Sequence, residues 1–155
     1  MQNELLQKRL IGRYKAVFAF LALLLFCTSC TEIRLISDYD EETDRAVAAL
    51  QKKVETLLTS LEKTLGTNEG AFSNYEDDYD EIKIDLSSLQ VRADSRPKNQ
   101  IQIDQLAEIA KQLALFEQAH KAGMDKAEIP PFRNGFNQSF RAIITLELAK
   151  KRGES

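Results

Sequence analysis

The chain has few of the residues on which enzymes and metalloproteins depend. It contains one histidine, His120, and two cysteines, both close to the N-terminus. A ferritin-like di-metal centre needs a Glu-x-x-His motif on two helices, and Glu117 with His120 supplies only one. The sequence also contains no glycine-rich phosphate loop and no zinc-binding cluster of cysteines and histidines. We therefore expect no enzyme activity, no cofactor and no bound metal.

The chain also has little glycine and proline, no tryptophan and no excess of positive charge. Six glycines, three prolines and no tryptophan argue against a low-complexity or β-rich chain. The net charge is −3, and the first 29 residues hold four of the 21 basic and one of the 24 acidic side chains, so the remainder carries −6. Because nucleic acids are bound through basic surfaces, we expect no nucleic-acid partner.

The longest apolar run lies near the N-terminus. Residues 16–26 are eleven uncharged, aliphatic or aromatic side chains, and four basic residues precede them. The run is shorter than the ~20 residues that span a bilayer, and it is typical of the apolar core of a secretory leader. Two small residues, Thr28 and Ser29, then precede Cys30.

This leader resembles that of bacterial lipoproteins. The resemblance implies cleavage before Cys30 and attachment of lipid to its thiol, although Cys27 stands where that class usually has leucine. An ordinary signal peptide cut near Ser29 and an uncleaved membrane anchor remain alternatives. Residue 31 is threonine rather than the aspartate that often retains such proteins at the inner membrane. By the same resemblance, the expected location is the periplasmic side of the outer membrane.

We expect the chain to have four parts. They are a signal peptide (1–29), a lipidated cysteine with a short tether (30–37), a helical domain (38–152) and a frayed tail (153–155). The seven tether residues 31–37 reach at most ~23 Å, so the domain should lie close to its membrane. The stretch 31–44 is similar to small, uncharacterised bacterial lipoproteins of helical structure. That resemblance supports the compartment and the helices, and it supplies no activity.

Four stretches of the domain carry apolar residues at alternating spacings of three and four. This period predicts amphipathic helices over about 38–66, 72–94, 99–122 and 134–150. Asp38 and Glu41 match a capping box at the first start, and Pro97 should end the second helix. Because no single helix can bury its apolar face alone, we expect an all-α fold, an antiparallel up-down four-helix bundle.

The segment between the third and fourth predicted helices, residues 124–133, is expected to be the longest loop. Exposed apolar and aromatic groups that gather in one patch commonly mark a protein contact. We therefore predict a partner-binding surface at the membrane-distal tip, formed by Met124, Ile129, Phe132 and Arg133.

Six basic residues should gather at the opposite, membrane-proximal end. They are Arg92, Arg96, Lys98, Lys150, Lys151 and Arg152. Two roles remain open for them: contacts with lipid phosphates, or ion pairs with the acidic side chains of residues 38–44 in the same chain.

These features predict a lipid-anchored periplasmic protein that serves as a structural or adaptor module for a protein partner at the cell envelope. The alternative is a carrier whose core admits a lipid or a hydrophobic small molecule. A hydrolase that uses the carboxylates of residues 76–81 is a third hypothesis. Those acids lie along the polar side of a predicted helix, where a solvated surface is the simpler interpretation.

Overall fold

The computed structural model describes residues 36–153. The predicted leader, Cys30 and most of the tether lie outside the described residues. Within residues 36–153 the chain forms four α-helices and three short 3-10 helices, with no β-strand. The all-helical prediction is therefore confirmed. None of the described helices is long and apolar enough to cross a membrane.

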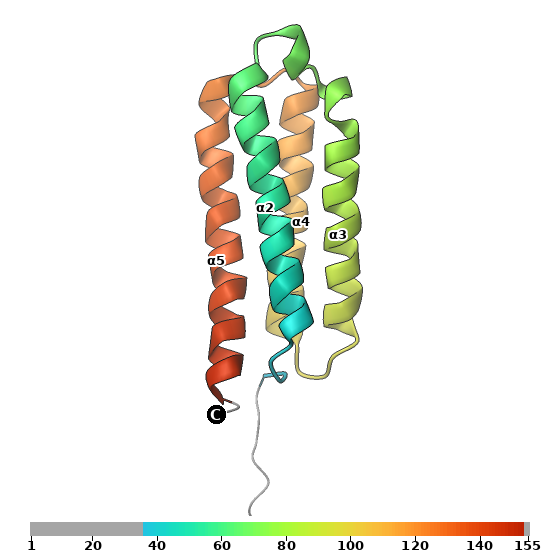
Figure 1. Cartoon of the computed structure of the whole chain (residues 1–155), viewed down its shortest axis with the longest axis vertical. Coiled ribbons are helices and arrows are strands. Elements are labelled where there is room, and N and C mark those ends of the chain that lie inside the picture. Colours follow the sequence, from blue (N-terminus) through green and yellow to red (C-terminus); the bar gives the residue numbers. More distant parts are fainter. Residues whose placement is uncertain (1–35, 154–155) are drawn as a thin grey trace, which may run out of the picture. The chain divides into compact units, whose positions relative to one another are not determined.

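Figure 1 colours the helices in their order along the chain. The α-helices are α2 (Glu41–Thr64), α3 (Glu76–Asp94), α4 (Gln100–Lys121) and α5 (Ile129–Gly153). The 3-10 helices are η1 (Asn68–Gly70), η2 (Phe72–Asn74) and η3 (Lys126–Glu128). All three 3-10 helices thus belong to the α2–α3 and α4–α5 connections.

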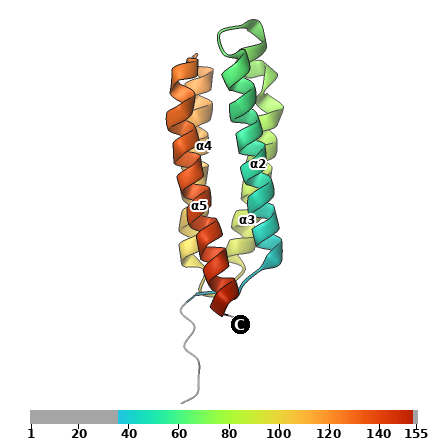
Figure 2. The same cartoon turned by 60° about the vertical axis from the view of Figure 1, so that its left-hand side comes forward.

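The four α-helices lie side by side in a bundle-like fold (Figures 1 and 2). Each packs against two neighbours, because α3 and α5 flank α2 and the same two helices flank α4. The α2–α3 and α4–α5 connections lie at the upper end of Figure 1, and the α3–α4 connection lies at the lower end. We call the lower end the base, where α2 begins and α5 ends, and the upper end the far end.

The core lies between the helices and consists of the apolar positions that the three-four spacing predicts. Every α-helix contributes fully buried side chains, among them Leu50, Leu61, Tyr79, Ile82, Leu106, Phe116, Phe136 and Phe140. Ile84 and Val91, which lie off the apolar face of α3, are 64% and 68% exposed. Full burial of one such side chain contributes about 1.5–3 kcal/mol, so this shared core holds the helices together.

The predicted capping box of Asp38 and Glu41 is wrong. α2 begins at Glu41 with Asp40 as its N-cap residue, and the side chain of Asp40 caps no backbone N–H. Its carboxylate instead accepts hydrogen bonds from Thr43 Oγ1 at 2.6 Å and from Arg92 Nη2 at 2.8 Å. The side chain of Asp40 therefore binds α3 instead of capping α2. No local sequence pattern reveals this contact.

The predicted loop of residues 124–133 is also wrong, because α5 begins at Ile129 rather than near residue 134. Pro130 and Pro131 lie in its first turn. Backbone N–H groups in that turn have no acceptor within the helix, so proline there costs no hydrogen bond.

A capping box around η3 precedes this helix. Asp125 Oδ1 accepts a hydrogen bond from Ala127 N at 2.7 Å, and Asp125 N donates one to Glu128 Oε2 at 2.8 Å. The Asp-x-x-Glu pattern is therefore the local signal for the start of this helical segment.

Candidate functional site

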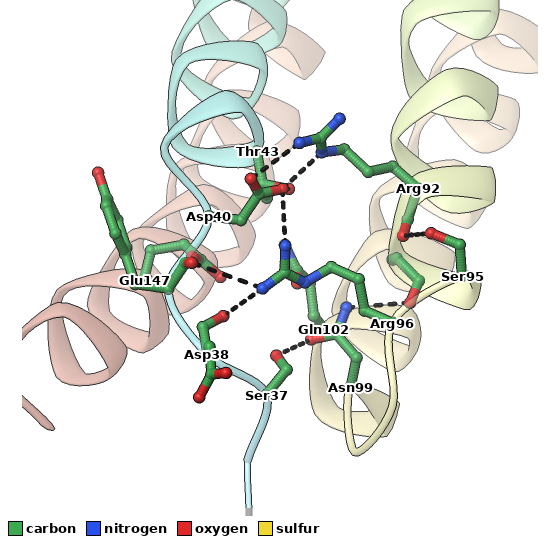
Figure 3. Close-up of polar contacts among 12 residues, drawn as sticks. Ser37, Asp38, Asp40, Thr43, Arg92, Ser95, Arg96, Asn99, Gln102 and Glu147 are labelled. Atoms are coloured by element: carbon green, nitrogen blue, oxygen red, sulfur yellow. Dashed lines mark hydrogen bonds and ion pairs between the residues drawn. The ribbon is translucent and has the colours of Figure 1, made fainter. Parts of the chain in front are cut away.

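Polar side chains and one backbone oxygen, that of Asp38, from three separate parts of the chain meet at the base (Figure 3). The first part is residues 36–40, which we call the approach segment. The second is the corner between α3 and α4, and the third is the last two turns of α5. We call the group the base cluster, and its members are Ser37, Asp38, Asp40, Arg92, Arg96, Asn99, Gln102, Glu147 and Lys150. Figure 3 labels all of them except Lys150.

A buried ion pair lies at the centre of the base cluster. The side chains of Lys150 and Glu147 are 2% and 1% exposed, and Lys150 Nζ donates to Glu147 Oε1 at 2.7 Å. The same nitrogen donates to Asn99 Oδ1 and to Gln102 Oε1, each at 3.1 Å. A lysine ammonium has three donor hydrogens, so every one of them has a partner from the protein.

The approach segment is joined to this pair through Asn99. Ser37 Oγ donates to Asn99 Oδ1 at 2.8 Å, and Ser37 N donates to the carbonyl oxygen of Lys98 at 3.1 Å. Lys98 has a φ of 60°, in the left-handed region that non-glycine residues rarely adopt. Asn99 Nδ2 donates to the carbonyl oxygen of Ala93 at 3.1 Å. Asn99 Oδ1 is thus an acceptor shared by the approach segment and α5.

A second ion pair ties the approach segment to α3. Arg92 donates from both Nε and Nη2 to the two oxygens of Asp40, and Arg96 Nη1 lies 3.3 Å from Asp40 Oδ2. Arg96 Nη2 also donates to the backbone oxygen of Asp38 at 2.7 Å. The hydrogen bonds from Arg92 hold the pKa of the Asp40 carboxyl well below its usual range, and burial opposes this shift only in part.

Two buried atoms of the base cluster, Gln102 Nε2 and Glu147 Oε2, have no hydrogen-bond partner among the described residues. An unpaired buried polar atom costs about 1–3 kcal/mol, and the desolvation of a buried ion pair offsets much of its attraction. The geometry therefore favours a role in positioning three chain segments over a role in adding stability.

The single histidine lies at the other end of the molecule, in the far end of the core. His120 Nε2 lies 2.9 Å from the carbonyl oxygen of Gly70, and His120 Nδ1 lies 3.1 Å from Tyr79 Oη. A carbonyl can only accept, so Nε2 carries a proton, and in the neutral imidazole Nδ1 then accepts from the tyrosine hydroxyl. Burial raises the pKa of that hydroxyl. Both ring nitrogens thus bind protein atoms, and within residues 36–153 no group of three metal-ligating side chains lies together.

The predicted partner-binding surface is not an exposed patch. Met124 and Ile129 are buried, and Phe132 is half-buried against Phe116, with ring centroids 5.0 Å apart. Arg133 pairs with two glutamates of α2. The prediction that these side chains are exposed is wrong, because the segment folds as η3 and the first turn of α5 and so closes the core.

The six predicted membrane-proximal basic residues do lie around the base, but the structure assigns them different surroundings. Arg92 and Arg96 pair with Asp40, which is the intramolecular role foreseen for them. Lys150 is buried and pairs with Glu147 of its own helix, which is neither of the two roles left open for it. Lys151 lies over the ring of Tyr39 at 5.1 Å, and Lys98 and Arg152 have exposed side chains.

Sequence reasoning missed Ser37, Asn99, Gln102 and Glu147 as members of a site. A signal for part of the set exists in α5, where the three-four spacing that runs through Phe140 and Ile143 continues to Glu147 and Lys150. Charged residues at two successive core positions are rare unless they are paired, so this pattern indicates a buried ion pair. It does not identify the partners on other elements.

No known protein family, no curated protein and no solved structure matches the chain. The all-helical fold and the base cluster are therefore the observations on which a function can be argued.

Proposed function

We propose that this chain is a lipid-anchored periplasmic protein whose domain is an antiparallel up-down four-helix bundle, and that it acts as a structural or adaptor module for a protein partner at the cell envelope. The observation that carries the proposal is the base cluster, in which Asn99 of the α3–α4 corner binds both Ser37 of the approach segment and Lys150 of α5. The base cluster fixes the orientation of the helices relative to residues 36–40. A module that presents one surface to a partner needs a fixed orientation of this kind.

Hydrogen bonds at both ends support the up-down arrangement. At the base, Ser37 before α2 bonds to Asn99 before α4. At the far end, His120 near the end of α4 bonds to Gly70 before α3, and Lys126 before α5 bonds to the backbone of α2 near its end at 3.1 Å. This pattern is the one expected when consecutive helices run in opposite directions and are joined by short connections.

In this proposal Cys30 carries the lipid. The chain from Cys30 to Ser37 reaches at most ~23 Å when it is fully extended, so the base would lie next to the lipid headgroups, most simply those of the outer membrane. The basic leader, the short apolar run and the small residues before Cys30 support this anchor.

The packed core favours the adaptor role over the carrier role. Large side chains from all four helices, such as Leu50, Tyr79, Phe116 and Phe140, fill the centre of the described domain and are almost fully buried. Protein interiors of this kind are close-packed, so a lipid would have to displace core side chains to enter.

Metabolic labelling with a radioactive fatty acid tests the anchor. The wild-type chain should incorporate label and fractionate with membranes, while Cys30→Ser should incorporate none and accumulate as uncut precursor or as soluble protein. Cys27→Ser is the matched control and should be labelled like the wild type. Equal labelling of wild type and Cys30→Ser would show that Cys30 is not the lipid attachment site.

Site-specific photo-cross-linking in cells tests the adaptor role. A photoreactive amino acid placed at exposed apolar positions on three helices, Ile84 on α3, Leu115 on α4 and Leu148 on α5, should cross-link one protein from one helix face and not from the others. If no position cross-links a protein, and added phospholipid raises the melting temperature of the purified chain, the carrier replaces the adaptor as the better function.

A further inference from the structure

One oxygen atom connects the two ends of the described chain. Asn99 Oδ1 accepts from Ser37 Oγ at 2.8 Å and from Lys150 Nζ at 3.1 Å. Ser37 belongs to the approach segment, and Lys150 lies in the last turn of α5. All three residues are buried, at 7%, 3% and 4% exposure for Ser37, Asn99 and Lys150.

Ser37 and Asn99 are in direct contact, and both are almost fully buried. We therefore expect removal of the Ser37 side chain to let water reach Asn99 Oδ1 and compete for the ammonium of Lys150. Hydrogen bonds and ion pairs are stronger in a water-excluded site than in water. The contacts that Lys150 makes with Asn99, Gln102 and Glu147 should therefore weaken when Ser37 leaves.

A second contact joins the same two segments without Asn99. Lys151 Nζ lies 5.1 Å from the ring centroid of Tyr39, so α5 contacts the approach segment directly through Lys151, while Lys150 reaches it only through Asn99. On its other side the approach segment is bound by Arg92 and Arg96 of α3 and its corner. We therefore expect a displacement of residues 36–40 to change the contacts of the last turn of α5.

We propose that the base cluster couples the approach segment to the C-terminal turns of α5. When Ser37 is bound to Asn99, residues 147–153 are ordered. When Ser37 is pulled from Asn99, the ion pair of Lys150 with Glu147 becomes hydrated and these turns loosen. The inference rests on the proposed function, because attachment of the tether to a membrane would allow the anchor to displace Ser37.

Hydrogen–deuterium exchange on the full-length chain in detergent micelles tests this coupling. Ser37→Ala should speed the exchange of the backbone amides of residues 147–153 by about fivefold, the size typical of coupling within one hydrogen-bond network. Exchange in residues 66–75 at the far end should not change. Ser88→Ala is the matched control, since it removes an exposed hydroxyl that bonds only to the backbone of its own helix, and it should leave residues 147–153 at the wild-type rate.

The coupling must also act in the opposite direction, because linkage between two sites is reciprocal. Lys150→Met should therefore speed exchange in residues 36–40 by a similar factor beyond the acceleration of residues 66–75 that its general loss of stability causes, and equal acceleration of the two segments would overturn the coupling. Should Lys150→Met fail to fold, Ser37→Ala decides the question alone, because that variant removes one hydroxyl and leaves the ion pair in place.

Two results with Ser37→Ala would also overturn the proposal. One is an unchanged exchange rate of residues 147–153 in Ser37→Ala. The other is an equal acceleration of residues 66–75, which would show a general loss of stability instead of a coupling at the base. Neither result depends on lipid at Cys30, so failure of the coupling and failure of the anchor are separate outcomes.

Discussion

Replacement of Lys150 by methionine is the most direct test of how the base cluster works. Methionine has a similar length and no charge, so the variant removes the ammonium and keeps most of the apolar stem. Glu147 Oε1 and Gln102 Oε1 then lose the donor that Lys150 supplies, and Asn99 Oδ1 keeps only the hydrogen bond from Ser37. The carboxylate of Glu147, whose side chain is 1% exposed, is left without its counter-ion.

Leaving one member of a buried ion pair unpaired typically costs about 3–5 kcal/mol. A domain of this size has a free energy of unfolding of about 5–15 kcal/mol, so Lys150→Met should fold but be severely destabilised. The double variant Lys150→Met with Glu147→Leu removes both charges together. Because an apolar replacement of a buried pair is often neutral or stabilising, the double variant should be more stable than Lys150→Met alone.

Urea unfolding of the full-length chain in micelles, followed by circular dichroism, measures these differences. The control is Arg45→Met, which breaks the pair of Arg45 with Glu41. Those side chains lie 2.6 Å apart but are 70% and 67% exposed, and an exposed helical pair of this kind contributes only about 0.5 kcal/mol. The reasoning fails if Lys150→Met is no less stable than Arg45→Met, or if the double variant is less stable than Lys150→Met.

Three further predictions use the same unfolding assay. Arg92 lowers the folded-state pKa of Asp40. The ion pair therefore contributes about 1 kcal/mol to the free energy of unfolding above the unfolded pKa of about 4, and this contribution is lost as the pH falls toward the folded-state pKa. Asp40→Asn should therefore be less stable than wild type at neutral pH and approach it in acid, and a constant difference would contradict this. Ile129→Ser should lose about 3 kcal/mol because Ile129 is buried in the core, while the exposed Ile84→Ser should change stability by less than about 0.5 kcal/mol; equal losses would mean that Ile129 is not a core residue. Lys98→Gly should gain about 0.5 kcal/mol, because glycine adopts the positive φ of this position without strain, and a loss of stability would refute that explanation.

The sequence by itself determined the helical elements, because the spacing of apolar residues is a local property with a known geometric meaning. The periodic positions of α2, α3 and α4 are the buried positions of the structure, and Ile84 and Val91, which break the pattern of α3, are exposed. The start of α5 was predicted too late, since residues 124–133, which include Pro130 and Pro131, were expected to form a loop. The capping box of Asp125 and Glu128 was the better local signal.

Only the tertiary structure decided what the polar residues do. Glu147 and Lys150 occupy core positions of α5, so their burial can be read from periodicity. Their partners Asn99 and Gln102 lie about fifty residues away along the chain, and Ser37 lies more than a hundred residues away. Such contacts depend on which helices become neighbours and in what register. The same reason explains why the predicted exposed tip proved to be core, since burial of Ile129 depends on helices that no local pattern places around it.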